Sequence, residues 1–383
     1  MSISRRRFAL GAGALALLGG TTAACSSTST GGPGGDKTIR FGVSGPLTGD
    51  QAQYGKDWRE GFDLAVEQIN AKGGVKGAKV SYDFQDSQGQ ANQATTIAQK
   101  FVADSGILAV MGDFSSATSM VASPLYQRGQ VLQLGITNSH PDFTKTGDFI
   151  FSPSITQNDE AKTMADGAKR LGSKAAVFYL NTDWGKTAFS IFAGQAKTNG
   201  LEIVYSSPVE EKSTDFKPLL LKAKESGADI VQMITYYATT AVLVQQAKQV
   251  GLTTPKFSCV GSNFSPQFLD NAKDAANGVY LETAFFPGSD MPSTVEFVKA
   301  FKAKYSHDPN NFNAFAYDGL SQLAWAYEHS DGSRTGIRNA LRDADSIPSV
   351  IYAKQKYNAE RRIDNPSFTW LQVQDGKFTL VKV

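Results

Sequence analysis

Short apolar segments rich in β-branched residues recur at regular intervals along the chain. Most are bounded by Gly, Asp or Ser, and few alternate polar with apolar residues, which is typical of strands buried on both faces of a parallel sheet. We therefore predict a strand at each of these segments. They are residues 38–44, 79–84, 107–112, 130–136, 175–180, 202–207, 229–235 and 256–261.

Stretches with helical periodicity lie between the predicted strands. One apolar face repeats at helical spacing from Ala94 to Val102, and another runs from Tyr54 to Ile69. Strands that alternate with helices predict parallel sheets joined by right-handed crossovers. The sequence thus predicts an α/β fold with two doubly wound parallel-sheet lobes in succession.

The junction between the two lobes is expected where FSPSITQND, starting at Phe151, interrupts the pattern. After residue 286 the chain has two helical stretches and a strand-like end with a turn at Asp375-Gly376. This segment is too short for a third such domain, so its elements return to the other two through a hinge with several crossovers. We predict lobe 1 at 38–156 plus 286–354 and lobe 2 at 157–285 plus 355–383. The two helical stretches are 292–305 and 314–330.

The N-terminus predicts export. Three arginines, Arg5 to Arg7, precede an apolar run that is too short to span a membrane, and the pattern resembles a twin-arginine signal peptide over residues 1–24. Cys25 ends a lipobox-like TTAAC, although Thr22 replaces the usual branched aliphatic residue. We expect a lipid on Cys25 and a flexible tether over 25–37, which places the domain in the periplasm or on the outer face of the membrane. The alternative is an unmodified signal cleaved nearby.

Charge and cysteine content narrow the possible classes of protein. The chain has 38 basic and 36 acidic residues, so nothing in its charge attracts nucleic acid. If Cys25 carries a lipid, Cys259 is the one remaining thiol, and no intramolecular disulfide forms. We expect Cys259 to be a small buried residue rather than a catalytic cysteine. At 383 residues the chain exceeds one ordinary core, which agrees with two domains.

The candidate ligand site lies in the loops that follow the predicted strands, because parallel sheets bind ligands beyond the carboxyl ends of their strands. These loops are rich in hydroxyls, amides and aromatic rings and poor in acids, bases and metal ligands. They comprise residues 44–54, 113–119, 136–140, 181–184, 235–239 and 261–264.

The motifs do not favour an enzyme. GDFSSATS, which starts at Gly112, lacks the second glycine of a nucleophile elbow, so a hydrolase using Ser116 is the weakest interpretation. Asp113 is a candidate base, although an acid at such a strand end is more often structural. No phosphate-loop or metal motif is present in the sequence, and we expect no cofactor and no metal. Hydroxyls beside a helix N-terminus hold carboxylates well, although Ser115 or Ser116 could serve only as an N-cap.

Nearly the whole chain from residue 38 resembles one known family. The stretch GVSGPLTGDQAQYGKDWREGFDLAVEQINAKGGVKG at 42–77 is similar to the opening of the leucine/isoleucine/valine-binding proteins, the type I periplasmic binding proteins of ABC importers. GDFSSATSMVASPLY, LGITNSHPDFT, WGKTAF, ADIVQMITYY, QAKQVGL, AYDGL and QDGKF continue the resemblance. It implies a periplasmic binding protein-like fold and a binding protein that is not an enzyme.

The resemblance implies a set of ligand-binding residues. Ser116 and Thr137, with the backbone near Ile136, match the positions that hold an amino acid's carboxylate in the first lobe. Tyr54 matches a tyrosine that closes over the ligand. From the second lobe, Trp184 and Tyr236 match aromatic residues that face the ligand, although Trp184 could be a packing aromatic.

Two departures from the family concern the ligand's ammonium group. A family glutamate would fall near Gly261, and a family aspartate at the lobe junction falls at Gln157, which we keep as a candidate ligand contact. Burying an unpaired ammonium would be costly. Either Asp183, Glu282 or Asp159 supplies the charge, or the ligand is an amide, a urea-like compound or a simple carboxylate.

The sequence thus predicts a monomeric, lipid-anchored solute-binding protein. It would capture an amino acid or a related small molecule by hinge closure and deliver it to the transmembrane subunits of an ABC permease. The alternative is a ligand sensor with the same fold that passes the closure to a signalling partner.

Overall fold

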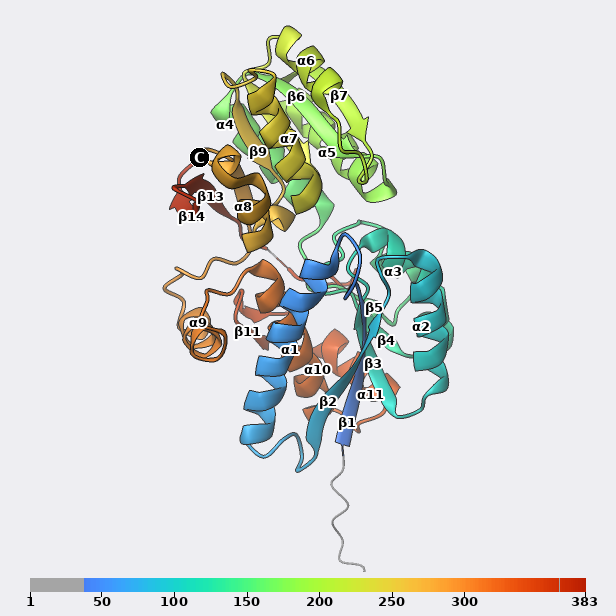
Figure 1. The fold of residues 1–383 in the computed structure, drawn as a ribbon. Coiled ribbons are helices and arrows are strands. Elements are labelled where there is room, and N and C mark those ends of the chain that lie inside the picture. Colours follow the sequence, from blue (N-terminus) through green and yellow to red (C-terminus); the bar gives the residue numbers. More distant parts are fainter. Residues whose placement is uncertain (1–37, 365) are drawn as a thin grey trace, which may run out of the picture. The chain divides into compact units, whose positions relative to one another are not determined.

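A computed structural model describes residues 38–364 and 366–383 (Figure 1). The predicted signal peptide, the lipidation of Cys25 and the tether lie outside the described residues. No helix in the described part of the chain is long and apolar enough to cross a membrane.

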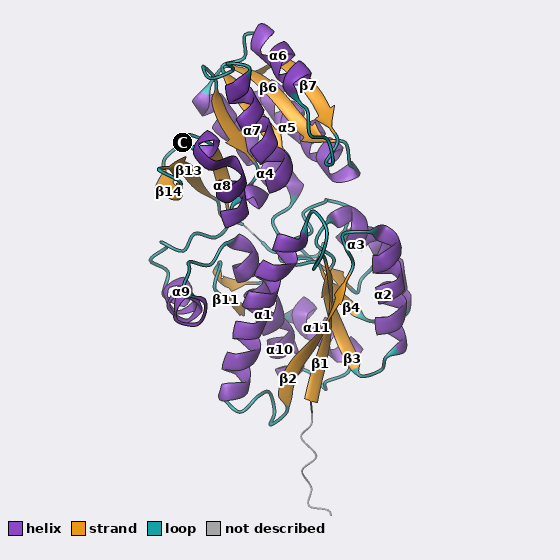
Figure 2. Cartoon of the chain, in the orientation of Figure 1, coloured by secondary structure: helices purple, strands orange, loops and turns teal. Residues whose placement is uncertain are grey.

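The first sheet has five parallel strands in the order β2-β1-β3-β4-β5. Its strands are β1 (Thr38–Gly45), β2 (Lys79–Asp86), β3 (Ile107–Gly112), β4 (Leu132–Leu134) and β5 (Ile150–Phe151), with the helices α1 (Ala52–Ala71), α2 (Ala91–Ala103) and α3 (Ser116–Arg128) and the short 3₁₀ helix η1 (Thr144–Thr146). Helices α1 and α2 cover opposite faces of this sheet (Figure 2). In the strand order, β2 lies on one side of β1 and β3 to β5 lie on the other, so the direction of winding reverses between β1 and β3. The carboxyl ends of these two strands pair at Ser44 and Gly112.

The second sheet has seven strands in the order β14-β13-β10-β9-β8-β6-β7. Strands β6 to β10 are parallel to one another, whereas β13 and β14 form an antiparallel hairpin at one edge. The strands are β6 (Lys174–Leu180), β7 (Glu202–Val209), β8 (Ile230–Ile234), β9 (Lys256–Cys259), β10 (Tyr280–Thr283), β13 (Thr369–Gln374) and β14 (Lys377–Val381). The helices are α4 (Gln157–Leu171), α5 (Asp183–Asn199), α6 (Lys217–Glu225), α7 (Tyr237–Gln249) and α8 (Pro266–Ala272), with the 3₁₀ helices η2 (Gly261–Asn263) and η3 (Lys273–Ala276).

The segment after β10 returns to the first sheet. Its elements are α9 (Pro292–Tyr305), α10 (Asn311–Glu328), α11 (Arg334–Asp343) and the two-stranded sheet of β11 (Ile347–Ser349) and β12 (Ala353–Gln355). Helix α11 begins with Arg334, whose guanidinium donates to the backbone oxygens of Ile107 at 3.0 Å and Asp104 at 2.6 Å, beside β3. The predicted residue limits of the two lobes stay a prediction.

The predicted fold class is confirmed, and so is each of the predicted strands. The predicted strand at 130–136 shrinks to the three residues of β4, because a turn closes from Asn138 N to Gly135 O at 3.2 Å and Gln130 has a φ of 50°. The predicted turn at Asp375-Gly376 is present, with φ values of 49° and 72°. Pattern reasoning missed β5, β10, β11, β12 and α11, the four strands being only two to four residues long.

Helices α1 and α10 approach each other closely at Gly61. A Cβ at this position would lie 2.3 Å from the backbone oxygen of Asn313 and 2.9 Å from the Cβ of Ala316. Buried polar groups fix the same contact, because the Asn313 side chain donates to Asp57 O at 2.7 Å and Asn310 donates to the Asp57 carboxylate at 2.8 Å. The absence of a side chain at Gly61 is therefore what lets α10 lie against α1.

Gly61→Ala is expected to lower the free energy of unfolding by about 1–3 kcal/mol, because the added methyl group overpacks a rigid backbone contact. Gly194→Ala is the matched control: Gly194 is an exposed glycine of α5, and a Cβ added there would meet nothing within 4 Å. Because alanine favours a helix interior more than glycine does, Gly194→Ala is expected to raise the free energy of unfolding by up to about 1 kcal/mol. Urea unfolding measures both, and equal effects of the two variants would contradict the close approach.

Candidate functional site

One cavity is lined by loops from the carboxyl ends of both sheets. The space free of protein atoms within its lining is about 630 Å³, open solvent included. The β3–α3 loop, the loop after β4, the starts of α4 and α5, and the loops after β8, β9 and β10 contribute to it, as does α10. Phe368, just before β13, completes the wall.

One wall of the cavity carries hydroxyl groups at the start of α3. Ser115 is the N-cap, and its Oγ accepts a hydrogen bond from Thr118 N at 3.1 Å. Ser116 is thereby left free of the capping role; its Oγ accepts from His140 N at 3.2 Å, and no acceptor for its own hydroxyl hydrogen is found among the described residues. Thr137 donates to Phe114 O at 3.0 Å. These hydroxyls adjoin the first N–H groups of α3, which have no partners inside the helix, so this wall suits an anion.

Asp113 is buried behind this wall and does not line the cavity. Its carboxylate accepts from Ser44 Oγ at 2.8 Å and from Phe114 N at 2.6 Å. Burial raises the pKa of Asp113. These hydrogen bonds connect the end of β1 to the residues that follow β3. We therefore favour a structural role for Asp113 over a role as a catalytic base.

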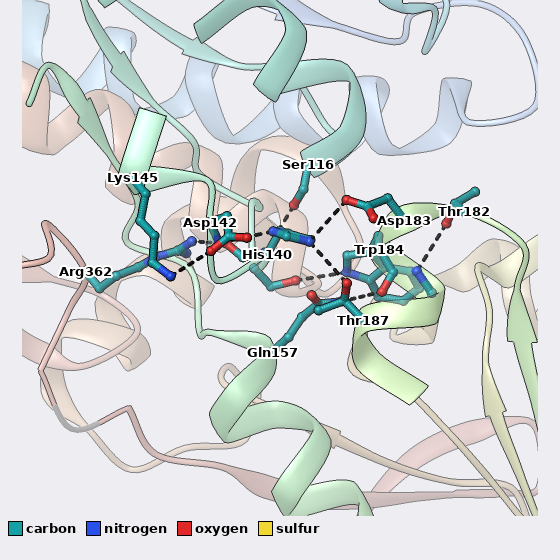
Figure 3. A network of polar contacts seen from close by, with 12 residues as sticks. Ser116, His140, Asp142, Lys145, Gln157, Thr182, Asp183, Trp184, Thr187 and Arg362 are labelled. Carbon is teal, nitrogen blue, oxygen red and sulfur yellow. Dashed lines mark hydrogen bonds and ion pairs between the residues drawn. The ribbon is translucent and has the colours of Figure 1, made fainter. Parts of the chain in front are cut away.

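Aromatic rings form the opposite wall. Trp184 stacks on Tyr236 with ring centroids 5.1 Å apart and planes 25° apart. Trp184 Nε1 donates to Ser139 Oγ at 3.0 Å, and Gln157 Nε2 donates to the backbone oxygen of Trp184 at 2.7 Å (Figure 3). The indole is therefore fixed both by its ring nitrogen and by its backbone.

The structure brings Ser116, Thr137, Trp184 and Tyr236 together at the cavity. The other three predicted contacts, Tyr54, Ile136 and Gln157, lie behind its walls. The ligand roles of all seven residues stay predictions.

Each of these three buried residues supports a wall. Tyr54 stacks on Phe114 at 4.0 Å, and its hydroxyl donates to Ser262 O at 3.3 Å. Ile136 is packed so tightly that a Cβ at Gly319 would lie 2.6 Å from it. Gln157 holds the backbone of Trp184 and leaves its own Oε1 without a hydrogen-bond donor among the described residues.

Of the three acids considered for the ligand's ammonium group, Glu282 alone lines the cavity. Asp159 is exposed and accepts from Thr156 at the start of α4. Asp183 is 71% exposed and pairs with His140 at 3.3 Å (Figure 3).

Glu282 is buried beside Gly261, the residue that stands where the family has a glutamate. Its side chain reaches from β10 to Gly261, whose N–H donates to Oε1 at 3.0 Å. Oε2 has no hydrogen-bond partner among the described residues, and Glu282 is 1% exposed. An acid from the neighbouring strand thus stands beside Gly261.

Sequence reasoning missed a second acid, Glu160. It lies in the first turn of α4, three residues after Gln157, and its half-buried side chain lines the same cavity. Burial raises the pKa of Glu160 and of Glu282, and the charge of Glu160 raises the pKa of Glu282 further. The signal available in the sequence was the position of Glu160 at the start of a helix that directly follows the predicted lobe junction.

The remaining candidate chemistry is sparse. Cys259 is buried and free, and burial raises the pKa of its thiol. In the described part of the chain no group of three or more His, Cys, Asp or Glu side chains could hold a metal ion.

The sequence profile of the periplasmic binding protein family matches residues 38–377, which is most of the chain. The chain belongs to the periplasmic binding protein family. The family comprises solute-binding proteins rather than enzymes, so the prediction of a non-enzymatic protein is confirmed. This chain is an ABC-type substrate-binding protein of type I, as its resemblance to leucine/isoleucine/valine-binding proteins predicted.

Known relatives of this periplasmic binding protein agree over nearly its whole length. It is 27% identical over 365 residues to Leu/Ile/Val-binding protein homolog 8 of Brucella abortus (strain 2308), covering 90% of each chain. Among solved structures, the leucine binding protein LivK of Thermotoga maritima superposes with a TM-score of 0.84 at 21% identity, covering 90% of this chain and 98% of that one. A solute binding protein of R. palustris in complex with 4-hydroxybenzoate gives 0.82 at 21% identity, with 91% and 96% covered. At these identities the solved structures show the shared fold.

In the ligand-free protein, Glu282→Gln is expected to raise the free energy of unfolding near pH 7.5 by about 1 kcal/mol or more and to change it little near pH 4.5. The folded-state pKa of Glu282 is raised above the unfolded value, so the folded protein retains a proton that the unfolded chain releases, and stability falls as pH rises between the two pKa values. Gln can still accept from Gly261 N. Thermal melts at the two pH values, with the exposed Glu202→Gln as control, measure the difference. A pH-independent difference would contradict the raised pKa.

Proposed function

We propose that this protein is the extracytoplasmic binding component of an ABC importer and that it captures an amino acid or a related small carboxylate or amide. The observation that supports this most directly is the cavity, because one wall carries hydroxyls and a helix N-terminus while the other carries aromatic rings and acids. Such a site suits a molecule with an anionic end, an apolar body and a cationic end.

The anionic end would lie at the start of α3. Ser116 and Thr137 offer hydroxyl groups, and the first N–H groups of α3 add donors with the positive end of the helix dipole. No Lys, Arg or His side chain lines the cavity in the described part of the chain. Recognition of the carboxylate would therefore depend on neutral donors.

The cationic end would lie beside Glu282. Its free Oε2 has no protein partner among the described residues, so a ligand ammonium group would supply the hydrogen bonds that this oxygen lacks. This assignment explains how the protein could bind an amino acid with glycine at position 261. The solute binding protein of R. palustris, whose structure contains 4-hydroxybenzoate, indicates that the fold also accepts aromatic molecules.

Capture would proceed by hinge closure between two lobes, 38–156 with 286–354 and 157–285 with 355–383. Contacts such as that of Trp184 Nε1 with Ser139 Oγ and that of Tyr54 with Ser262 O join the two lobes around the cavity. Ligand that contacts both lobes would favour the state in which these bonds form. A permease could then distinguish loaded from empty protein by shape.

The proposed protein works as a monomer and is held at the outer face of the membrane by a lipid on Cys25. It would deliver its ligand to the transmembrane subunits of the permease. Membership in a family of periplasmic proteins supports this location.

Ser116→Ala and Thr137→Val are each expected to weaken ligand binding about 10- to 100-fold, because each removes a hydroxyl that would donate to the charged carboxylate. The Thr137 hydroxyl would turn to the ligand from Phe114 O, its acceptor in this structure. A thermal-shift panel of amino acids, amides, ureas and aromatic carboxylates identifies the ligand first. Titration calorimetry with that ligand then compares the variants.

Thr198→Ala is the control, since Thr198 is an exposed residue of α5 whose hydroxyl donates to Gly194 O, 3.0 Å away, and bonds to no other described residue. Its affinity should equal that of the unmodified protein. Unchanged affinity in both Ser116→Ala and Thr137→Val would overturn the assignment of the carboxylate site.

A further inference from the structure

Two carboxyl groups line the cavity, and none of its described lining residues carries a compensating positive charge. Glu160 from α4 and Glu282 from β10 both line it, and their charges interact. The other lining residues in the described part of the chain are uncharged. A single ligand ammonium group would neutralise only one of the two acids.

Neither carboxyl group has a sufficient structural role. Glu282 uses Oε1 to accept from Gly261 N but leaves Oε2 unpartnered at 1% exposure. Glu160 makes no side-chain hydrogen bond to any described residue, and its backbone N–H donates to Thr156 O at 2.9 Å. Burying acidic groups without partners destabilises a protein. The arrangement is therefore better explained by a ligand that brings the missing positive charge.

The surrounding rings favour cations as well. Tyr236 lines the cavity and stacks on Trp184. Burial is the largest cause of its raised pKa, and the charges of Glu211 and Glu160 raise that pKa further. Faces of tyrosine and tryptophan attract cations, and Phe312 and Phe315 add two further rings to the lining. Acids and aromatic faces in one cavity form an environment suited to a basic nitrogen or a guanidinium group.

We propose that this cavity selects ligands of net positive charge, namely amino acids that carry a second basic group, and that Glu160 and Glu282 together bind their two cationic groups. The inference rests on the proposed function and sharpens it. The carboxylate would lie at Ser116 and Thr137, and the charges of the two basic groups would balance those of the two ionised acids. A neutral amino acid, which has one ammonium group, would balance only one of these acids, and the other would stay protonated.

The test compares ligands of matched shape that differ in charge. Lysine against norleucine and arginine against citrulline are titrated into the unmodified protein by calorimetry at pH 7.5. We expect the charged member of at least one pair to bind tenfold or more tightly than its neutral partner. This comparison needs no variant and therefore does not depend on the folding of one.

Glu160→Gln is expected to lower the preference for the charged ligand over its neutral partner at least tenfold. The exposed Glu225→Gln on α6 is the matched control and should keep the full preference. Circular dichroism melts establish that both variants are folded.

The remaining outcomes separate the inference from the proposed function. Equal or tighter binding of norleucine and citrulline would overturn the inference and leave the amino-acid binding function standing. A preference for charge that survives Glu160→Gln would overturn the role of Glu160. If none of these ligands binds and the amides, ureas and aromatic carboxylates fail too, the proposed function falls and the inference falls with it.

Discussion

Unpaired N–H groups at helix starts are the constraint on which this site depends. Parallel strands place the start of every following helix at one edge of the sheet, and the first turn of a helix cannot satisfy its own donors. Ser116 opens α3, Glu160 lies in the first turn of α4, Trp184 is the second residue of α5, and Tyr236 caps α7. The topology gathers these residues although they are far apart in the sequence.

Desolvation determines what those helix starts can bind. The hydroxyl wall has neutral donors, so the proposed carboxylate would bind there without a permanent counter-ion, whereas Glu160 and Glu282 are costly to keep ionised in the empty cavity. Burial is the largest cause of the raised pKa values of Glu160 and Glu282. A bound cation would offset that cost, so ligand charge and the protonation of these groups are linked. The polarity of the cavity would thus orient the proposed ligand.

Strand spacing and helical periodicity were enough to predict the two parallel sheets, because buried strands and amphipathic helices leave direct signals in sequence. Short elements such as β5 and β10 left none. The candidate site was predicted only as far as loop position allowed: Ser116 and Trp184 line the cavity, whereas Tyr54 lies behind Phe114. That distinction depends on side-chain packing, which sequence spacing does not specify.

The sequence offered Glu282 as one of three candidate acids but did not show that it lies beside Gly261. Glu282 reaches it from β10, a strand four residues long that the pattern did not reveal. Adjacency of β9 and β10 in the sheet, rather than nearness in sequence, brings the carboxylate to the loop. Glu160 likewise reaches the cavity because of where the first turn of α4 lies in the fold, which its place in the sequence does not reveal.

Hydrogen–deuterium exchange with and without the identified ligand tests the central claim, capture between the two walls of one cavity, most directly. We predict that saturating ligand protects the start of α3 around Ser116 and the segments around Gly261 and Glu282 together. Protection at a different surface, or at one wall with the other unchanged, would contradict capture between the two walls.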